Sequence, residues 1–170
     1  MPVKDIQEMP TVSAVQKEMS LALMEFYDNI VQMESILVDF GSDYNLSISE
    51  IHAIVAVGSV ASPNNTLSGV ASQLKVRPPS ATAMMTKLSH KGYVQRVRSQ
   101  QDRRMVWIEL TRKGRYVYLM YRRFHLKMVR ELLQDMNEDD SHVLLFGLRK
   151  LRDFFAAKVR EEEELRTSNK

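Results

Sequence analysis

Residues 66–98, TLSGVASQLKVRPPSATAMMTKLSHKGYVQRVR, decide the fold that the sequence predicts. Thr66 is a residue type that caps helices, and the apolar positions after it predict a short helix over about 67–74. Residues 75–78 interrupt the pattern. A second helix is expected over about 79–90, because a proline is tolerated in the first turn of a helix, where its missing N–H has no intrahelical partner. Two helices joined by a tight turn predict a helix-turn-helix.

The second of these helices has a small, polar outward side. Its apolar positions Ala81, Met85 and Leu88 share one face at 100° per residue. The other side carries hydroxyls, methyls and cations that suit base edges, thymine methyls and phosphates in a major groove. The candidate DNA-contacting residues of this region are Arg77, Ser80, Thr82, Ala83, Thr86 and Lys87.

A β-hairpin is predicted directly after this helix, with strands over about 93–98 and 105–110. Three long cationic side chains, Arg98, Arg103 and Arg104, lie at its tip, and such side chains suit a narrow, electronegative minor groove. Asp102 lies among them. It either forms a salt bridge that aims a neighbouring arginine or caps its own turn.

Helices flank this region on its N-terminal side. Ser47 and Glu50 have capping-box spacing, which predicts a helix that ends at about Gly58. Before it, apolar residues repeat at alternating spacings of four and three and predict one long helix that Gly41 would end. This narrow seam suits either the protein's own core or a partner helix, and it consists of Met19, Leu23, Phe26, Ile30, Met33, Leu37 and Phe40.

The C-terminal side is also helical. Thr111 is expected to cap a helix that ends at about Leu133. Asn137 and the acids after it begin the last helix at the positive end of its dipole, and that helix is expected to fray from about Glu161.

The predicted fold class is therefore mainly α with a small β-hairpin wing: a winged helix-turn-helix lobe flanked by helices from both chain ends. The 170 residues suffice for a domain with its own core. The predicted divisions are a disordered tail (1–11), an N-terminal helix (12–45), the winged lobe (46–112), C-terminal helices (113–163) and a second tail (164–170).

The distribution of charge favours an anionic partner. Residues 75–130 hold 15 Lys and Arg against two acids, whereas the rest of the chain holds 9 basic and 19 acidic residues. A solvated basic surface is the plainer alternative to a nucleic-acid footprint.

Other residue types limit the function classes. The chain has no cysteine, which excludes disulfides, thiolate zinc sites and thiol redox sensing. No phosphate-binding glycine loop, HExxH or GxSxG motif occurs, so an enzyme is not expected. The four histidines are scattered, so neither a metal site nor a resident cofactor is expected. No signal peptide or long apolar run is visible, and the expected location is the cytoplasm.

Several motifs resemble the MarR family of winged helix-turn-helix regulators. The resemblance extends over about residues 46–117, and its motifs are ASQLKV (71–76), LSHKGYVQR (88–96), DRR (102–104) and LTRKG (110–114). It implies a homodimer that binds a pseudo-palindromic operator in double-stranded DNA. It further implies that a helical dimerisation region built from both chain ends, the N-terminal dimerisation helix (12–45) and the C-terminal dimerisation helices (113–163), joins the two copies. It also implies that Arg104 enters the minor groove and that Asp102 orients it.

Three stretches resemble more narrowly the fatty-acid-synthesis repressor branch of that family (FabT-like). They are SISEIHAI (47–54), residues 91–104 and RRFHLKMV (122–129). The resemblance implies repression of fatty-acid biosynthesis genes, with long-chain acyl-acyl carrier protein as corepressor. The consecutive prolines Pro78 and Pro79 depart from the expected pattern and leave the operator sequence open.

An acyl chain would need only apolar walls, so no polar signature would mark its site. Ordinary core packing and an acyl pocket are both compatible with the apolar candidates Phe26, Ile30, Met33, Val55, Met85, Met120 and Phe124. A second candidate surface consists of Arg123, Lys127 and Arg130, which recur on one helix face. It would dock the acidic carrier protein, face phosphates or simply be solvated.

Two other functions stay open at this point. One is a MarR-type regulator that another small apolar or phenolic ligand releases from DNA. The other is an architectural DNA-binding protein without an effector. A basic module that docks a protein or an anionic membrane is disfavoured by the helix-turn-helix and its charged hairpin.

Overall fold

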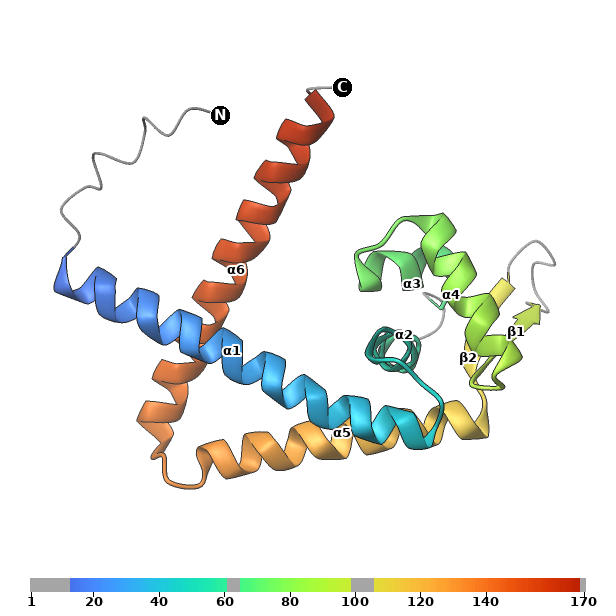
Figure 1. The fold of residues 1–170 in the computed structure, drawn as a ribbon, viewed down its shortest axis with the longest axis horizontal. Helices are drawn as coiled ribbons and strands as arrows, with labels where there is room; N and C mark the ends of the chain where they lie inside the picture. Colours follow the sequence, from blue (N-terminus) through green and yellow to red (C-terminus); the bar gives the residue numbers. More distant parts are fainter. Residues whose placement is uncertain (1–12, 61–64, 99–105, 169–170) are drawn as a thin grey trace. The chain divides into compact units, whose positions relative to one another are not determined.

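A computed structural model describes residues 13–60, 65–98 and 106–168. The elements follow the order α1 (Ala14–Asp43), α2 (Ile48–Ser59), α3 (Leu67–Leu74), α4 (Pro78–His90), β1 (Val94–Arg98), β2 (Val106–Leu110), α5 (Arg112–Leu133) and α6 (Glu138–Ser168) (Figure 1). The chain divides into two compact units, Met1–Tyr118 and Leu119–Lys170, and each is described by itself. The fold is mainly helical with one antiparallel hairpin, as the sequence predicts.

Side-chain caps start α2, α3 and α5 where the sequence places them. The Ser47 hydroxyl accepts a hydrogen bond from Glu50 N–H at 3.3 Å, and the Glu50 carboxylate accepts one from Ser47 N–H at 2.8 Å. Thr66 caps α3 by accepting from Gly69 N–H at 3.1 Å, and Thr111 accepts from Gly114 N–H at 3.1 Å. These caps satisfy N–H groups that have no partner within a helix.

A left-handed residue makes the turn between α3 and α4. Lys75 has a φ of 54°, and its N–H donates to the carbonyls of Ala71 and Ser72. Arg77 is extended before α4, which begins at Pro78, one residue earlier than predicted. Both prolines occupy the first two helical positions, where neither removes an intrahelical hydrogen bond.

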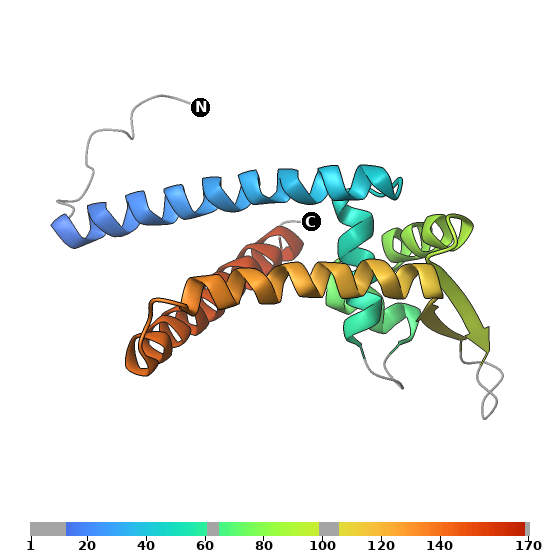
Figure 2. The same ribbon diagram turned by 90° about the horizontal axis from the view of Figure 1, so that it is seen from below.

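The hairpin is joined to the rest of the first unit. β1 and β2 are antiparallel, with Val94 opposite Leu110 and Arg98 opposite Val106. Ile108 N–H donates to the Asn65 carbonyl at 2.7 Å, so β2 also pairs with the residues before α3. Figure 2 shows the strands extending beside α4 and the start of α5.

The core of the first unit lies among α2, α3, α4, the hairpin and the start of α5. Tyr93 and Met85 are among its largest fully buried side chains. The buried apolar residues are Leu46, Ile51, Ala53, Ile54, Ala56, Val57, Val70, Ala71, Ala81, Met85, Leu88, Tyr93, Val94, Ile108 and Val117. The predicted apolar face of α4 (Ala81, Met85 and Leu88) is confirmed as part of this core.

Two glycines permit close packing in this unit. A Cβ on buried Gly114 would collide with the Tyr93 carbonyl, and a Cβ on Gly58 would lie 2.6 Å from the Tyr118 ring. The first turn of α5 thus lies directly against the chain that leads into β1.

Two predicted helix ends are wrong. α1 continues past Gly41 to Asp43, and the chain turns at Asn45, whose φ is 55°. Asparagine tolerates this left-handed conformation better than most residues, so it makes the turn without a glycine. α6 continues past Glu161 to Ser168, and Lys158 pairs with Glu161 across one turn at 2.7 Å.

Candidate nucleic-acid interface

The outward side of α4 presents small side chains at its N-terminal end. Arg77, Ser80 and Ala83 are exposed, as expected of residues that could reach base edges. Ser80 N–H donates to the Arg77 carbonyl, which fixes the backbone of the first turn.

The hydroxyls of the two threonines on α4 are less available for hydrogen bonds to DNA than the sequence suggests. Thr82 is half-buried, and its hydroxyl donates to the Pro78 carbonyl at 2.9 Å, so its one hydroxyl hydrogen is used within α4. The Thr86 hydroxyl is exposed and accepts a hydrogen bond from the Arg96 guanidinium at 3.1 Å. The hairpin strand thereby contacts the second helix of the helix-turn-helix.

Beside this contact lies an open hollow of about 410 Å³ between α3, α4 and the hairpin, lined by Leu67, Thr82, Arg96, Arg98, Val106 and Ile108. Arg98 is exposed at its rim, and Arg96 lies two residues earlier on the same face of β1. Arg96 is not among the DNA-contacting residues predicted from the sequence, although its period-two spacing from Arg98 could have identified it. The other predicted wing residues, Asp102, Arg103 and Arg104, lie outside the described residues.

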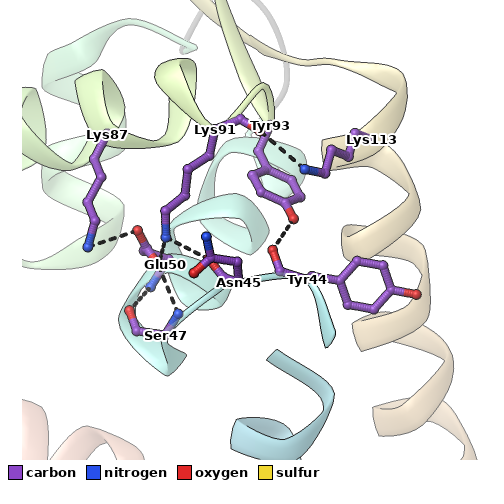
Figure 3. Close-up of polar contacts among 8 residues, drawn as sticks. All are labelled: Tyr44, Asn45, Ser47, Glu50, Lys87, Lys91, Tyr93 and Lys113. Atoms are coloured by element: carbon purple, nitrogen blue, oxygen red, sulfur yellow. Dashed lines mark hydrogen bonds and ion pairs between the residues drawn. The ribbon is translucent and has the colours of Figure 1, made fainter. Parts of the chain in front are cut away.

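The C-terminal half of α4 is tied to α2 by a buried carboxylate (Figure 3). Glu50 is 3% exposed, and one of its oxygens lies 3.2 Å from Lys87 Nζ. Its other oxygen accepts from Lys91 Nζ at 2.9 Å and from Ser47 N–H. Lys91 Nζ also donates to the Asn45 carbonyl at 2.6 Å. The sequence predicts the capping role of Glu50 but gives no signal for the two ion pairs.

This arrangement keeps Glu50 ionised. Burial alone would raise its pKa, but the hydrogen bonds from Lys91, the Ser47 backbone and Lys87 outweigh burial and lower the pKa to about 2. Lys87 is consequently more than a solvated cation. Its ammonium is held at a defined place on the outward surface of α4.

A second group of contacts fixes the chain after α4. Tyr93 is fully buried, and its hydroxyl donates to the Tyr44 carbonyl at 2.5 Å. Lys113 lies over the Tyr93 ring at 4.1 Å and donates to the Lys91 carbonyl at 3.3 Å. The start of α5 therefore holds the turn between α4 and the hairpin (Figure 3).

The apolar pocket candidates fall in both units. In the first, Phe26 and Ile30 are exposed, Met33 and Val55 are half-buried, and Met85 is fully buried in the core. In the second, Met120 and Phe124 are half-buried, and the Phe124 ring packs edge-on against His125. Met85 therefore fills the lobe core.

The three candidates for carrier-protein docking, Arg123, Lys127 and Arg130, are exposed on α5. Lys127 pairs with Glu131 at 3.7 Å, and both side chains remain mostly exposed. Exposed pairs of this kind contribute little to stability, so the cations stay available to a partner.

The described part of the chain contains no cluster of three or more residues that could hold a metal ion. Within the same ranges, none of the helices is both long and apolar enough to cross a membrane.

A helix-turn-helix with a basic outward side and an adjoining hairpin defines a winged helix DNA-binding protein. The comparisons with known proteins agree. Residues 37–118 match the family model for the transcriptional regulator SarA/Rot. FabT of Streptococcus pneumoniae, in its crystal structure with DNA, is 33% identical, with a TM-score of 0.72 over 82% of this chain and 96% of that chain.

Two other relatives are more distant. The HTH-type transcriptional regulator YhjH of Bacillus subtilis (strain 168) is 24% identical over 134 residues, which are 79% of this chain and 75% of that protein. A MarR/EmrR family regulator from Acinetobacter sp. ADP1 shares the fold at 19% identity, with a TM-score of 0.59 over 82% of this chain and 96% of that chain. The chain belongs to the MarR family of winged helix transcriptional regulators, which bind DNA and are not enzymes.

Proposed function

We propose that this protein is a homodimeric repressor of fatty-acid biosynthesis genes whose affinity for its operator rises with long-chain acyl-acyl carrier protein. The 33% identity to Streptococcus pneumoniae FabT, over 96% of that chain, carries the proposal. The basic surface of α4 and β1 supports the DNA-binding step. A regulator of bacterial genes would work in the cytoplasm.

The exposed apolar residues of both chain ends support a dimer. On α1, Met19, Phe26 and Ile30 are 55%, 53% and 43% exposed in the single chain. On α6, Phe146 and Phe154 are 63% and 55% exposed. Large apolar side chains at this density are costly in water, and a second copy of the same helices would cover them. Two-fold symmetry would then require half-sites about 10–11 bp apart.

The corepressor would act by selecting one conformation. An acyl chain that binds the DNA-competent dimer more tightly than the other state shifts the population toward the DNA-competent dimer. The size of this shift is set by the difference between the two affinities. The protein-borne acyl group would need an additional surface for its acidic carrier, and Arg123, Lys127 and Arg130 provide three exposed cations on one helix.

Fluorescence anisotropy on a fatty-acid-synthesis promoter fragment tests this function. We expect the acylated carrier to lower the Kd for the fragment and the bare carrier to leave it unchanged. Specific binding that ignores both would refute the corepressor while leaving the DNA-binding regulator intact.

The docking surface has its own test. Changing Lys127→Glu and Arg130→Glu together should abolish the response to the acylated carrier. Arg149→Glu with Arg160→Glu is the matched control, because both residues are exposed on α6 and the change in net charge is equal. A full response in the Lys127 and Arg130 variant would exclude this docking surface.

A further inference from the structure

Lys87 combines two properties that rarely occur together in a surface lysine. Its side chain is 63% exposed on α4, yet its ammonium lies 3.2 Å from a carboxylate that is only 4% exposed. A lysine on a solvated helix face normally samples many rotamers, and ordering it costs conformational entropy. In this protein a buried partner from another helix has already restricted that motion.

The position of the carboxylate is itself fixed. Glu50 belongs to the capping box that starts α2, and its Oε2 atom accepts from both Ser47 N–H and Lys91 Nζ. Its Oε1 atom faces Lys87. Because Lys91 already compensates the buried charge, Lys87 is not needed to neutralise Glu50.

The Lys87 ammonium can take a second anionic partner without leaving the first. An ammonium has three donors, and the ion pair with the Glu50 Oε1 atom at 3.2 Å occupies at most one of them. With most of the side chain exposed, a phosphate oxygen can approach the remaining donors from solvent.

We infer that Glu50 is a positioning residue of the DNA interface, which holds the Lys87 ammonium in place for a backbone phosphate before DNA binds. This inference rests on DNA binding alone and is independent of the operator, the target genes and the effector. Glu50 itself touches no DNA in this scheme. It lowers the cost of ordering Lys87 at the interface.

Charge alone predicts the opposite effect of removing Glu50. Glu50→Gln makes the lobe more positive by one charge, which by itself strengthens binding to phosphates. Loss of positioning weakens binding, by about three- to tenfold if one long side chain must be ordered anew. A glutamine can still accept from Ser47 N–H, so the cap of α2 is retained.

The experiment is a double-mutant cycle measured by anisotropy on a duplex that this protein has selected from a random-sequence library. The proteins are the wild type, E50Q, K87M and the double variant. E109Q is the matched control, because Glu109 is exposed on β2 and its change adds the same charge. We expect E50Q to bind the duplex about three- to tenfold more weakly than E109Q. When Lys87 is already methionine, adding E50Q should change the Kd by less than about twofold.

Two results would overturn the inference. One is an E50Q protein that binds as tightly as E109Q. The other is an equal loss for E50Q with and without Lys87, which would assign Glu50 a purely structural role. Failure of the protein to bind a fatty-acid-synthesis promoter would bear on the proposed function only, since the selected duplex does not presuppose it.

A measurement on the wild type covers the case in which E50Q does not fold. The ¹H–¹⁵N signals of lysine ammonium groups are observed at low temperature and assigned with K87M. Lys87 should show slowed proton exchange before DNA is added, unlike exposed Lys75 on the turn before α4. Exchange at Lys87 as fast as at Lys75 would contradict the inference.

Discussion

Gly114→Ala should destabilise the winged lobe, although alanine is the better helix former. Gly114 lies in the first turn of α5, where a Cβ would collide with the Tyr93 carbonyl and lie 3.0 Å from its carbon atom. Leu110 Cδ2, at 3.3 Å, closes the other side. Backbone atoms cannot rotate away as a side chain can, so α5 must shift away from the chain that leads into β1.

That shift would strain the two hydrogen bonds that Thr111 donates to this chain, one from its N–H and one from its hydroxyl. Its N–H donates to the Tyr93 carbonyl at 3.0 Å. Its hydroxyl contacts the Gly92 and Tyr93 carbonyls at 2.7 and 3.2 Å. With about 1 kcal/mol for each of these two hydrogen bonds, about 1–3 kcal/mol for overpacking and about 1 kcal/mol gained in helix propensity, the expected net loss is about 2–4 kcal/mol.

Urea unfolding followed by the fluorescence of Trp107 measures this loss at the lobe itself. Trp107 is the only tryptophan of the chain and lies in β2. The control is Gly147→Ala on α6, where a Cβ meets nothing within 4 Å among the described residues, so the helix should gain about 0.5–1 kcal/mol. Both variants are compared at one protein concentration. A Gly114→Ala protein within about 0.5 kcal/mol of the wild type would refute the close-contact argument.

Four further changes have defined outcomes. Gly92→Ala should lower the free energy of unfolding in urea by about 1 kcal/mol, because alanine is strained at a φ of +78°. The added Cβ meets no atom within 4 Å among the described residues, so an unchanged stability would exclude backbone strain at this position. Ser47→Ala removes the α2 cap and should cost about 1 kcal/mol in the same assay. Because the pKa of Glu50 is lowered from its ordinary value of 4.5 to about 2, the ionised carboxylate stabilises the fold above pH 4.5. On the order of 3 kcal/mol of the free energy of unfolding should be lost as the pH falls toward 2. Glu50→Gln should weaken this dependence of the free energy of unfolding on pH. A variant whose free energy of unfolding falls with acid as steeply as that of the wild type would contradict the prediction. Arg104→Ala should weaken specific DNA binding by about 1–3 kcal/mol in anisotropy, and an unchanged Kd would remove Arg104 from the interface.

The starts of α2, α3 and α5 could be predicted because each capping partner lies three residues away in the sequence. Ser47, Thr66 and Thr111 all accept from the N–H of the third residue after them. A local hydrogen bond leaves a local spacing, so the sequence alone contains it. The same reasoning predicts the apolar face of α4, since its residues recur at helical spacing.

Contacts between distant residues could not be predicted in this way. Glu50 and Lys91 are 41 residues apart, and nothing in either neighbourhood selects the other. Thr82 shows the same limit. Its place on the helix directs it away from Ala81 and Met85, but residues of α3 and the hairpin line the same hollow and leave Thr82 half-buried.

The contacts divide α4 into two parts with different roles. At its N-terminal end, Ser80 and Ala83 are small and exposed, and the described chain places no side chain over them. At its C-terminal end, Lys87 and Lys91 are tied to Glu50, and the following turn is held by Tyr93 and Lys113. A helix anchored at one end presents the other in a defined direction, because an α-helix is stiff over three turns. We therefore expect the first turns of α4 to read the bases, and we expect the anchored end to set the angle at which those turns reach the groove.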